Sequence, residues 1–182
     1  MSVSITMRLL PGNERNVDRI YQQILGFIHK QQNCKNLKSY SSTILFSIDQ
    51  THIKITFHTD DHEQLDFIIV EFFEKHVKYG DVSYILAFAL QFVSSLASHV
   101  RLHLDGGERP RLTIRILGEH QLKSALYTIF SSEIKISAKD KEDLNIIFTE
   151  KYVQLDGRYD RNLHRKTLNV IAMNYLLEEL EI

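Results

Sequence analysis

The 182-residue chain contains few of the residues that make sharp turns or cross-links. It has two prolines, seven glycines and one cysteine, Cys34. A single cysteine excludes an intrachain disulfide and a cysteine zinc cage, and a lone thiol fits a reducing compartment. The scarcity of glycine and proline predicts long regular elements joined by few tight turns.

Motifs of several enzyme classes are also missing from the sequence. Neither GxxxxGK[ST] nor GxGxxG occurs, which argues against P-loop NTPases and standard Rossmann enzymes. Gly-x-Ser-x-Gly is absent, and His58-Thr59 is not repeated as the second H-x-[ST] of a two-histidine phosphoesterase. We therefore expect no cofactor, and the sequence leans against an enzyme.

No segment has the length and hydrophobicity of a membrane span. The most apolar run, 84–93, includes Gln91 and is about half of the ~20 residues that a span needs. The N-terminus has no basic stretch leading into an apolar one, so no signal peptide is predicted. The formal net charge of −1 and pI of 6.8 exclude a histone-like binder and an acidic DNA mimic. We expect a soluble cytoplasmic protein without membrane contacts.

Alternating apolar and polar residues predict strands in several segments. In the first of them Val3, Ile5 and Met7 alternate with polar residues, and Pro11 ends the strand. The expected strands are 3–9, 43–48, 52–58, 99–104, 111–117 and 133–137.

Turn residues lie between some of these strands. Asp49-Gln50-Thr51 is expected to form a short hairpin turn. The segment 105–110, which contains both adjacent glycines, is expected to be the loop of a hairpin between 99–104 and 111–117. Residues 35–42 are expected to be a polar connection.

Apolar residues at helical spacing predict the helices. The segment 82–97 is apolar almost all round and belongs in the core, with Asp81 as its N-cap. For 140–153 a hairpin within 145–155 remains an open alternative. The expected helices are 15–32, 61–78, 82–97, 119–131, 140–153 and 162–180.

The order of these elements predicts one α+β domain over 1–182. The expected architecture is a mixed or antiparallel sheet with ferredoxin-like, split β-α-β elements and additional flanking helices. Alternation, rather than continuous apolar runs, indicates that each strand buries one face in the main core. No repeat or linker divides the chain.

The polar positions of the strands supply the main candidate site. Successive strand residues point to opposite faces, so basic and histidine side chains would collect on the face away from the core. This face would lack aromatic residues and hold few acids, which suits phosphates or an acidic protein surface better than stacked bases. Alternatively it is solvated, or the last two helices cover it with their acids. The candidate binding residues on it are Arg8, Lys54, His58, Arg101, His103, Arg115 and Lys135.

A second basic segment lies at the start of the last expected helix. Arg158, Arg161 and Arg165 would place positive charge where the helix dipole opposes it. A nucleic-acid or phosphate contact and a solvated helix start are both consistent with this segment.

Nine histidines do not make a metal site. His99 and His103, four residues apart on an expected strand, would be separated by about 13 Å, too far to share one ion. Cys34 lies among polar residues without a matching base and is expected to be inert. No metal is therefore expected.

These features favour, by elimination, a non-enzymatic partner-binding or inhibitory protein of the immunity or antitoxin kind. Its partner would be an acidic protein or another anionic ligand bound by the cationic sheet face. A nucleic-acid or nucleotide-binding protein that uses the same face is the alternative, and an enzyme using the sheet histidines is a third. The sequence leaves the oligomeric state open.

Overall fold

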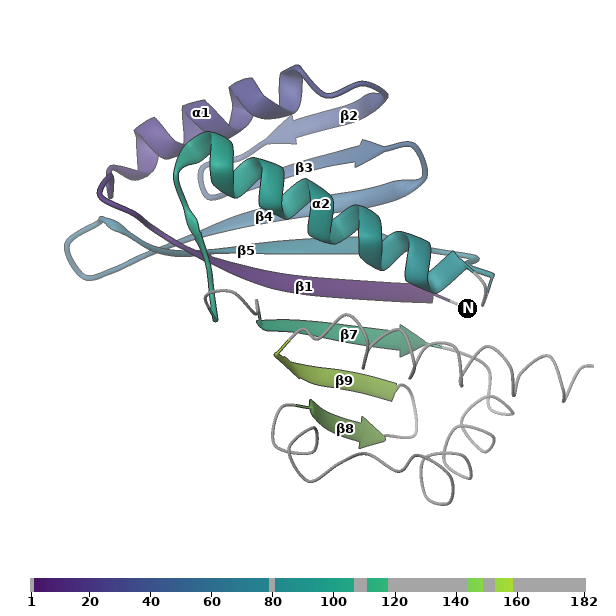
Figure 1. The fold of residues 1–182 in the computed structure, drawn as a ribbon. Helices are drawn as coiled ribbons and strands as arrows, with labels where there is room; N and C mark the ends of the chain where they lie inside the picture. The colour runs from purple at the N-terminus through teal and green to yellow at the C-terminus, as the bar shows by residue number, and fades with distance from the viewer. Residues whose placement is uncertain (1, 79–80, 107–110, 118–143, 149–152, 159–182) are drawn as a thin grey trace, which may run out of the picture.

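An antiparallel β-sheet forms the frame of the fold (Figure 1). The computed structural model describes residues 2–78, 81–106, 111–117, 144–148 and 153–158. The described strands are β1 (Ser2–Leu10), β2 (Cys34–Ser39), β3 (Thr43–Ile48), β4 (Thr51–Thr59), β5 (Leu65–Glu74), β6 (His103–Leu104), β7 (Arg111–Leu117), β8 (Leu144–Phe148) and β9 (Val153–Arg158). Their order in the sheet is β2-β3-β4-β5-β1-β7-β9-β8, with β6 also paired to β1. The predicted α+β class is confirmed, whereas the single domain over 1–182 stays a prediction.

Two described helices, α1 (Val17–His29) and α2 (Val82–Val100), lie on one face of this sheet (Figure 1). The side chain of Asn16 accepts a hydrogen bond from the Arg19 N–H and so caps the start of α1. Asp81 is the N-cap of α2, as predicted, although its side chain makes no capping hydrogen bond. Because α1 leads from β1 to the distant, parallel strand β2, the expected split β-α-β connection is present.

The core lies between the helices and the sheet face that they cover. Alternate residues of each central strand are buried there, as the periodicity predicts. Phe92 of α2 lies at the centre, with its ring 5.7 Å from Phe27 of α1, 5.9 Å from Phe46 of β3 and 5.8 Å from Phe72 of β5. One side chain thus joins both helices to the sheet, and the expected core position of 82–97 is confirmed.

The helix predicted over 61–78 is wrong, because the structure places the strand β5 there. β5 pairs with β4 on one side and with β1 on the other. Leu65, Ile68, Val70 and Phe72 are fully buried on the helix side, while the residues between them face the opposite way. Apolar residues on both faces of a strand also recur at helical spacing, so periodicity alone could not distinguish the two structures.

Three other local predictions need correction. Residues 35–42, expected to be a connection, include most of the edge strand β2. The strand expected over 99–104 is instead the end of α2, Arg101 and the two-residue β6. Segment 105–110 does not connect a hairpin, because β6 and β7 both run antiparallel to β1 along the same edge.

The alternative hairpin within 145–155 is confirmed by antiparallel pairing of β8 with β9, so the helix over 140–153 is wrong. The helices expected at 119–131 and 162–180 and the strand at 133–137 lie outside the described residues. In the part of the chain that is described, neither helix is long and apolar enough to cross a membrane.

Replacing Phe92 tests the central role of this ring. We expect Phe92→Ala to lower the free energy of unfolding by about 3–5 kcal/mol, because the cavity touches four elements. Tyr84→Ala is the matched control on the same helix: Tyr84 is 77% exposed, and its removal should cost less than about 0.5 kcal/mol. Urea unfolding of both variants measures the difference, and equal losses would contradict this description of the core.

Candidate functional site

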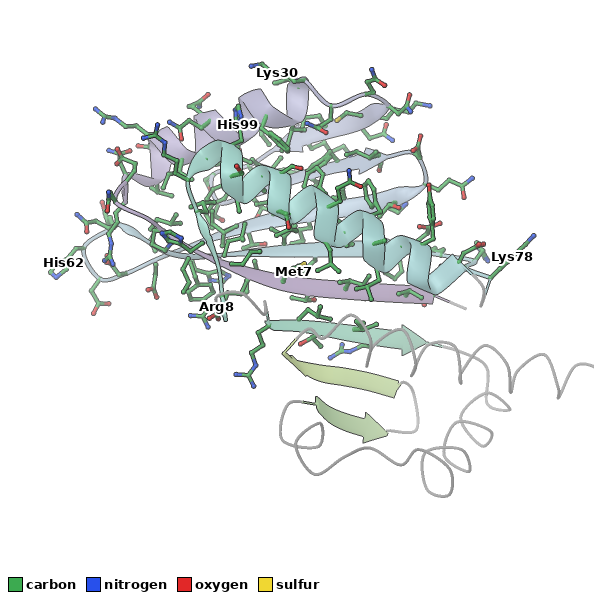
Figure 2. The ribbon with its side chains drawn as sticks, in the orientation of Figure 1. Met7, Arg8, Lys30, His62, Lys78 and His99 are labelled. Atoms are coloured by element: carbon green, nitrogen blue, oxygen red, sulfur yellow. The ribbon has the colours of Figure 1, made fainter. Side chains whose placement is uncertain are left out.

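The sheet face opposite α1 and α2 carries the candidate site, and we call it the open face. Met7 and Arg8, labelled in Figure 2, are consecutive on β1, yet Met7 is buried beneath the helices and Arg8 is exposed. Among the described elements, no helix covers this face; α1 and α2 both pack on the other side. The described part of the open face therefore presents its side chains away from both helices.

Strand register arranges the open face in rows. The β4 row comprises His52, Lys54, Thr56 and His58. In the same order, these lie opposite the β5 row of Phe73, Glu71, Ile69 and Phe67. On the other side of β5, Ser4, Thr6 and Arg8 of β1 lie opposite Phe73, Glu71 and Ile69. Thr113 and Arg115 of β7 continue the rows beyond Thr6 and Ser4.

The expectation that this face lacks aromatic residues is wrong. β5, predicted to be a helix, brings Phe67 and Phe73 onto it as half-buried side chains. The same strand brings Glu71 directly opposite Lys54, so the face is less uniformly cationic than the sequence indicated. The sequence could have placed Phe67, Glu71 and Phe73 on this face only if 65–74 had been predicted as a strand.

The structure brings together four of the predicted binding residues. Arg8, Lys54, His58 and Arg115 share the open face, on β1, β4 and β7. Arg158 is the last residue of β9, where the register places it opposite Arg111. Lys135, Arg161 and Arg165 lie outside the described residues.

Arg101 does not belong to the open-face cluster, so its predicted placement on a strand is wrong, whereas His103 of β6 lies opposite Leu10 at the end of the β1 row. Arg101 ends α2 in the left-handed conformation, with φ of 56°. With His99 and His103 it lines a separate depression of about 890 Å³ between the end of α2 and the loop after β1. The cause is the length of α2, which continues to Val100 where a strand was expected.

One end of the open face is organised around the ring of Phe67. The ring of His58 stacks on it with centroids 4.4 Å apart and an interplanar angle of 17°. The guanidinium carbon of Arg8 lies 4.1 Å from the Phe67 centroid, and Arg8 Nε lies 3.6 Å from Asp105 Oδ2. Because His58 and Arg8 come from strands on opposite sides of β5, Phe67 is held between its neighbours.

The other end of the open face has a depression of about 590 Å³, which we call the β2–β5 depression. Ser47, only 6% exposed, places its Oγ 3.0 Å from Nδ1 of His52. The residues lining the depression are Ser4, Asn36, Lys38, Leu45, Phe46, Ser47, His52, Ile53, Lys54, Glu71 and Phe73.

The Ser47–His52 contact lacks the further groups of a catalytic triad. A serine nucleophile needs a base that is itself oriented by a third group, together with donors for an oxyanion. Among the described residues, the ring of His52 forms its hydrogen bond with Ser47, and no carboxylate orients it. The contact therefore serves to position His52.

Cys34 and the histidines add no catalytic or metal centre within the described residues. Burial raises the pKa of the Cys34 thiol, which opposes formation of the reactive thiolate. Cys34 is half-buried against the core rather than surrounded by polar groups, which corrects the sequence expectation. Across the described ranges, no three His, Cys, Asp or Glu side chains are grouped to hold a metal ion.

No family model, curated protein or solved structure matches the chain. The chemistry of the open face is therefore the basis on which a function can be inferred.

The ring contact at Phe67 can be measured with a double-mutant cycle. We expect Arg8→Ala and Phe67→Ala to be coupled by about 0.5–1 kcal/mol, the value of an exposed cation–π contact. The control cycle combines Phe67→Ala with Arg19→Ala. Arg19 forms an ion pair with Glu14 at α1 and does not contact Phe67, so these two substitutions should be additive. Additive effects of Arg8 and Phe67 would contradict the contact.

The thiol of Cys34 should react with a disulfide reagent more slowly than free cysteine at mildly alkaline pH. Its raised pKa lowers the thiolate fraction, and its half-burial limits access. The unfolded protein in urea is the control and should react at the rate of free cysteine. A faster reaction in the folded protein would indicate an activated thiol.

Proposed function

We propose that the chain is a non-enzymatic partner-binding protein whose open face binds an acidic protein surface. The observation that carries this proposal is the mixture of apolar and basic side chains on a sheet face that no described helix covers. Phe67, Ile69 and Phe73 are half-buried there, beside Lys54 and Arg8. Aromatic residues and arginine are enriched in protein interfaces. A single exposed apolar residue is ordinary on a protein surface, but apolar residues grouped together indicate an interaction surface.

The charges of the open face favour an acidic partner. Arg8, Lys54 and Arg115 are exposed, and the acids beside them are Glu71, which lies opposite Lys54, and Asp105, which pairs with Arg8. Complementary charge speeds association and rejects basic competitors. The apolar residues between the cations would supply the area that must leave water.

Binding of single-stranded nucleic acid is the second candidate, because aromatic rings beside cations can stack on bases. Phe73 beside Lys54 favours it. Phe67 does not favour base stacking, because its ring is already in contact with His58 and Arg8. The aliphatic side chains of Leu45 and Ile69 also fit a protein partner better than a polynucleotide.

An enzyme using the sheet histidines has less support. His52 and His58 are six residues apart on β4, about 20 Å along an extended strand, so they cannot act on one reacting group. An inhibitory role of the immunity or antitoxin kind, exercised in the cytoplasm, is the narrower form of the binding proposal. Identification of the partner decides it.

Substitution of Ile69, at the middle of the open face, tests the proposal with the partner recovered by affinity capture. We expect Ile69→Asp to weaken binding at least tenfold, about 1.4 kcal/mol, because it adds a negative charge facing the acidic partner. Ile69→Lys removes the same apolar group but should lose less affinity. Lys30→Glu, beyond the end of α1, should bind normally.

Thermal melting should show that all three variants remain folded. Equal binding by Ile69→Asp and the unmodified protein would overturn the proposed interface. Binding of a labelled single-stranded oligonucleotide that weakens steeply with salt would select the nucleic-acid candidate instead.

A further inference from the structure

The β2–β5 depression has the size and composition of a small-molecule site. Its volume of about 590 Å³ falls within the ~300–1,000 Å³ range of ligand pockets. Lys38, His52 and Lys54 provide donors, whereas Leu45 and Phe73 provide apolar surface. An apolar lining with a few converging polar groups is the usual composition of such pockets.

The charge of the lining matches a monovalent anion. Lys38 and Lys54 carry two positive charges, and Glu71 carries one negative charge, which leaves one positive charge in excess. The ion pairs found among the described residues, Arg8–Asp105 and Arg19–Glu14, involve neither lysine. The single negative charge of a carboxylate would balance this one excess positive charge, whereas the two negative charges of a phosphate dianion would outnumber it.

The Ser47 hydroxyl holds the ring of His52 beside the depression. In the neutral tautomer in which Ser47 donates to Nδ1, the proton of His52 lies on Nε2, and in the other tautomer Nδ1–H donates to Ser47. An anion beside Nε2 favours the first tautomer, in which Nε2 is a donor. Ser47 is almost fully buried, so this contact fixes the orientation of the ring from beneath the face.

We propose that the β2–β5 depression binds a small organic acid with one carboxylate and a flat apolar body. The carboxylate lies among Lys38, His52 and Lys54, and the apolar body lies against Leu45 and Phe73. This site goes beyond the proposed function, because it requires no protein partner. Ile69 does not line the depression, so the two proposals can fail separately.

Phenylacetate is a suitable probe, titrated into the ¹⁵N-labelled protein and followed by NMR. We expect saturable shifts at Ser47, His52 and Phe73 in the millimolar range, as for a weak fragment. Lys54→Gln and Lys38→Gln should each weaken binding about 5–10-fold, since each removes one positive charge of the protein from beside the bound anion. Lys30→Gln is the matched control and should bind as the unmodified protein does.

Two further probes test the assigned chemistry. 2-Phenylethanol has the same ring without the charge and should produce no saturable shifts, and phenyl phosphate should bind more weakly than phenylacetate. Equal binding of the alcohol, tighter binding of the phosphate, or insensitivity to Lys54→Gln would each overturn the proposal. Ile69→Asp should retain phenylacetate binding, so loss of a protein partner in that variant leaves this site intact.

Discussion

The rest of the structure depends on the pairing of β5 with both β1 and β4. This pairing buries one row of apolar side chains beneath α1 and α2 and leaves a second row on the opposite face. The buried row joins the aromatic cluster through Phe72, whose ring contacts Phe92 of α2. Because the register is set on both sides, a slip of one residue would exchange the two rows and expose the core.

The same strand organises both ends of the open face. At one end Phe67 stacks with His58 and Arg8, and at the other Phe73 borders the depression that contains His52. In each case a phenylalanine of β5 lies opposite a histidine of β4. The two ends differ in what they offer, because the Phe67 ring is occupied by its neighbours while the depression at Phe73 is open. An extended protein surface and a small acid would therefore use different parts of one face.

Much of the architecture follows from periodicity in the sequence. Strict alternation correctly placed β1, β3, β4 and β7, and the apolar segment after Asp81 identified the buried helix α2. Arg8, Lys54, His58 and Arg115 were assigned to one face because their strands alternate clearly. The predictions for β5 and for residues 99–104 were wrong because apolar residues there suit both a helix and a strand, and local pattern cannot separate them.

The sequence by itself determined which strand residues face the core and that basic side chains collect on the other side, because side-chain direction alternates with every residue. Apart from the hairpins β3–β4 and β8–β9, tertiary structure alone decided which strands are neighbours. Neighbouring strands brought Phe67 beside Arg8 and Glu71 beside Lys54, pairs that lie far apart in the chain. It also removed Arg101 from that face, since the length of α2 depends on packing against the sheet rather than on local propensity.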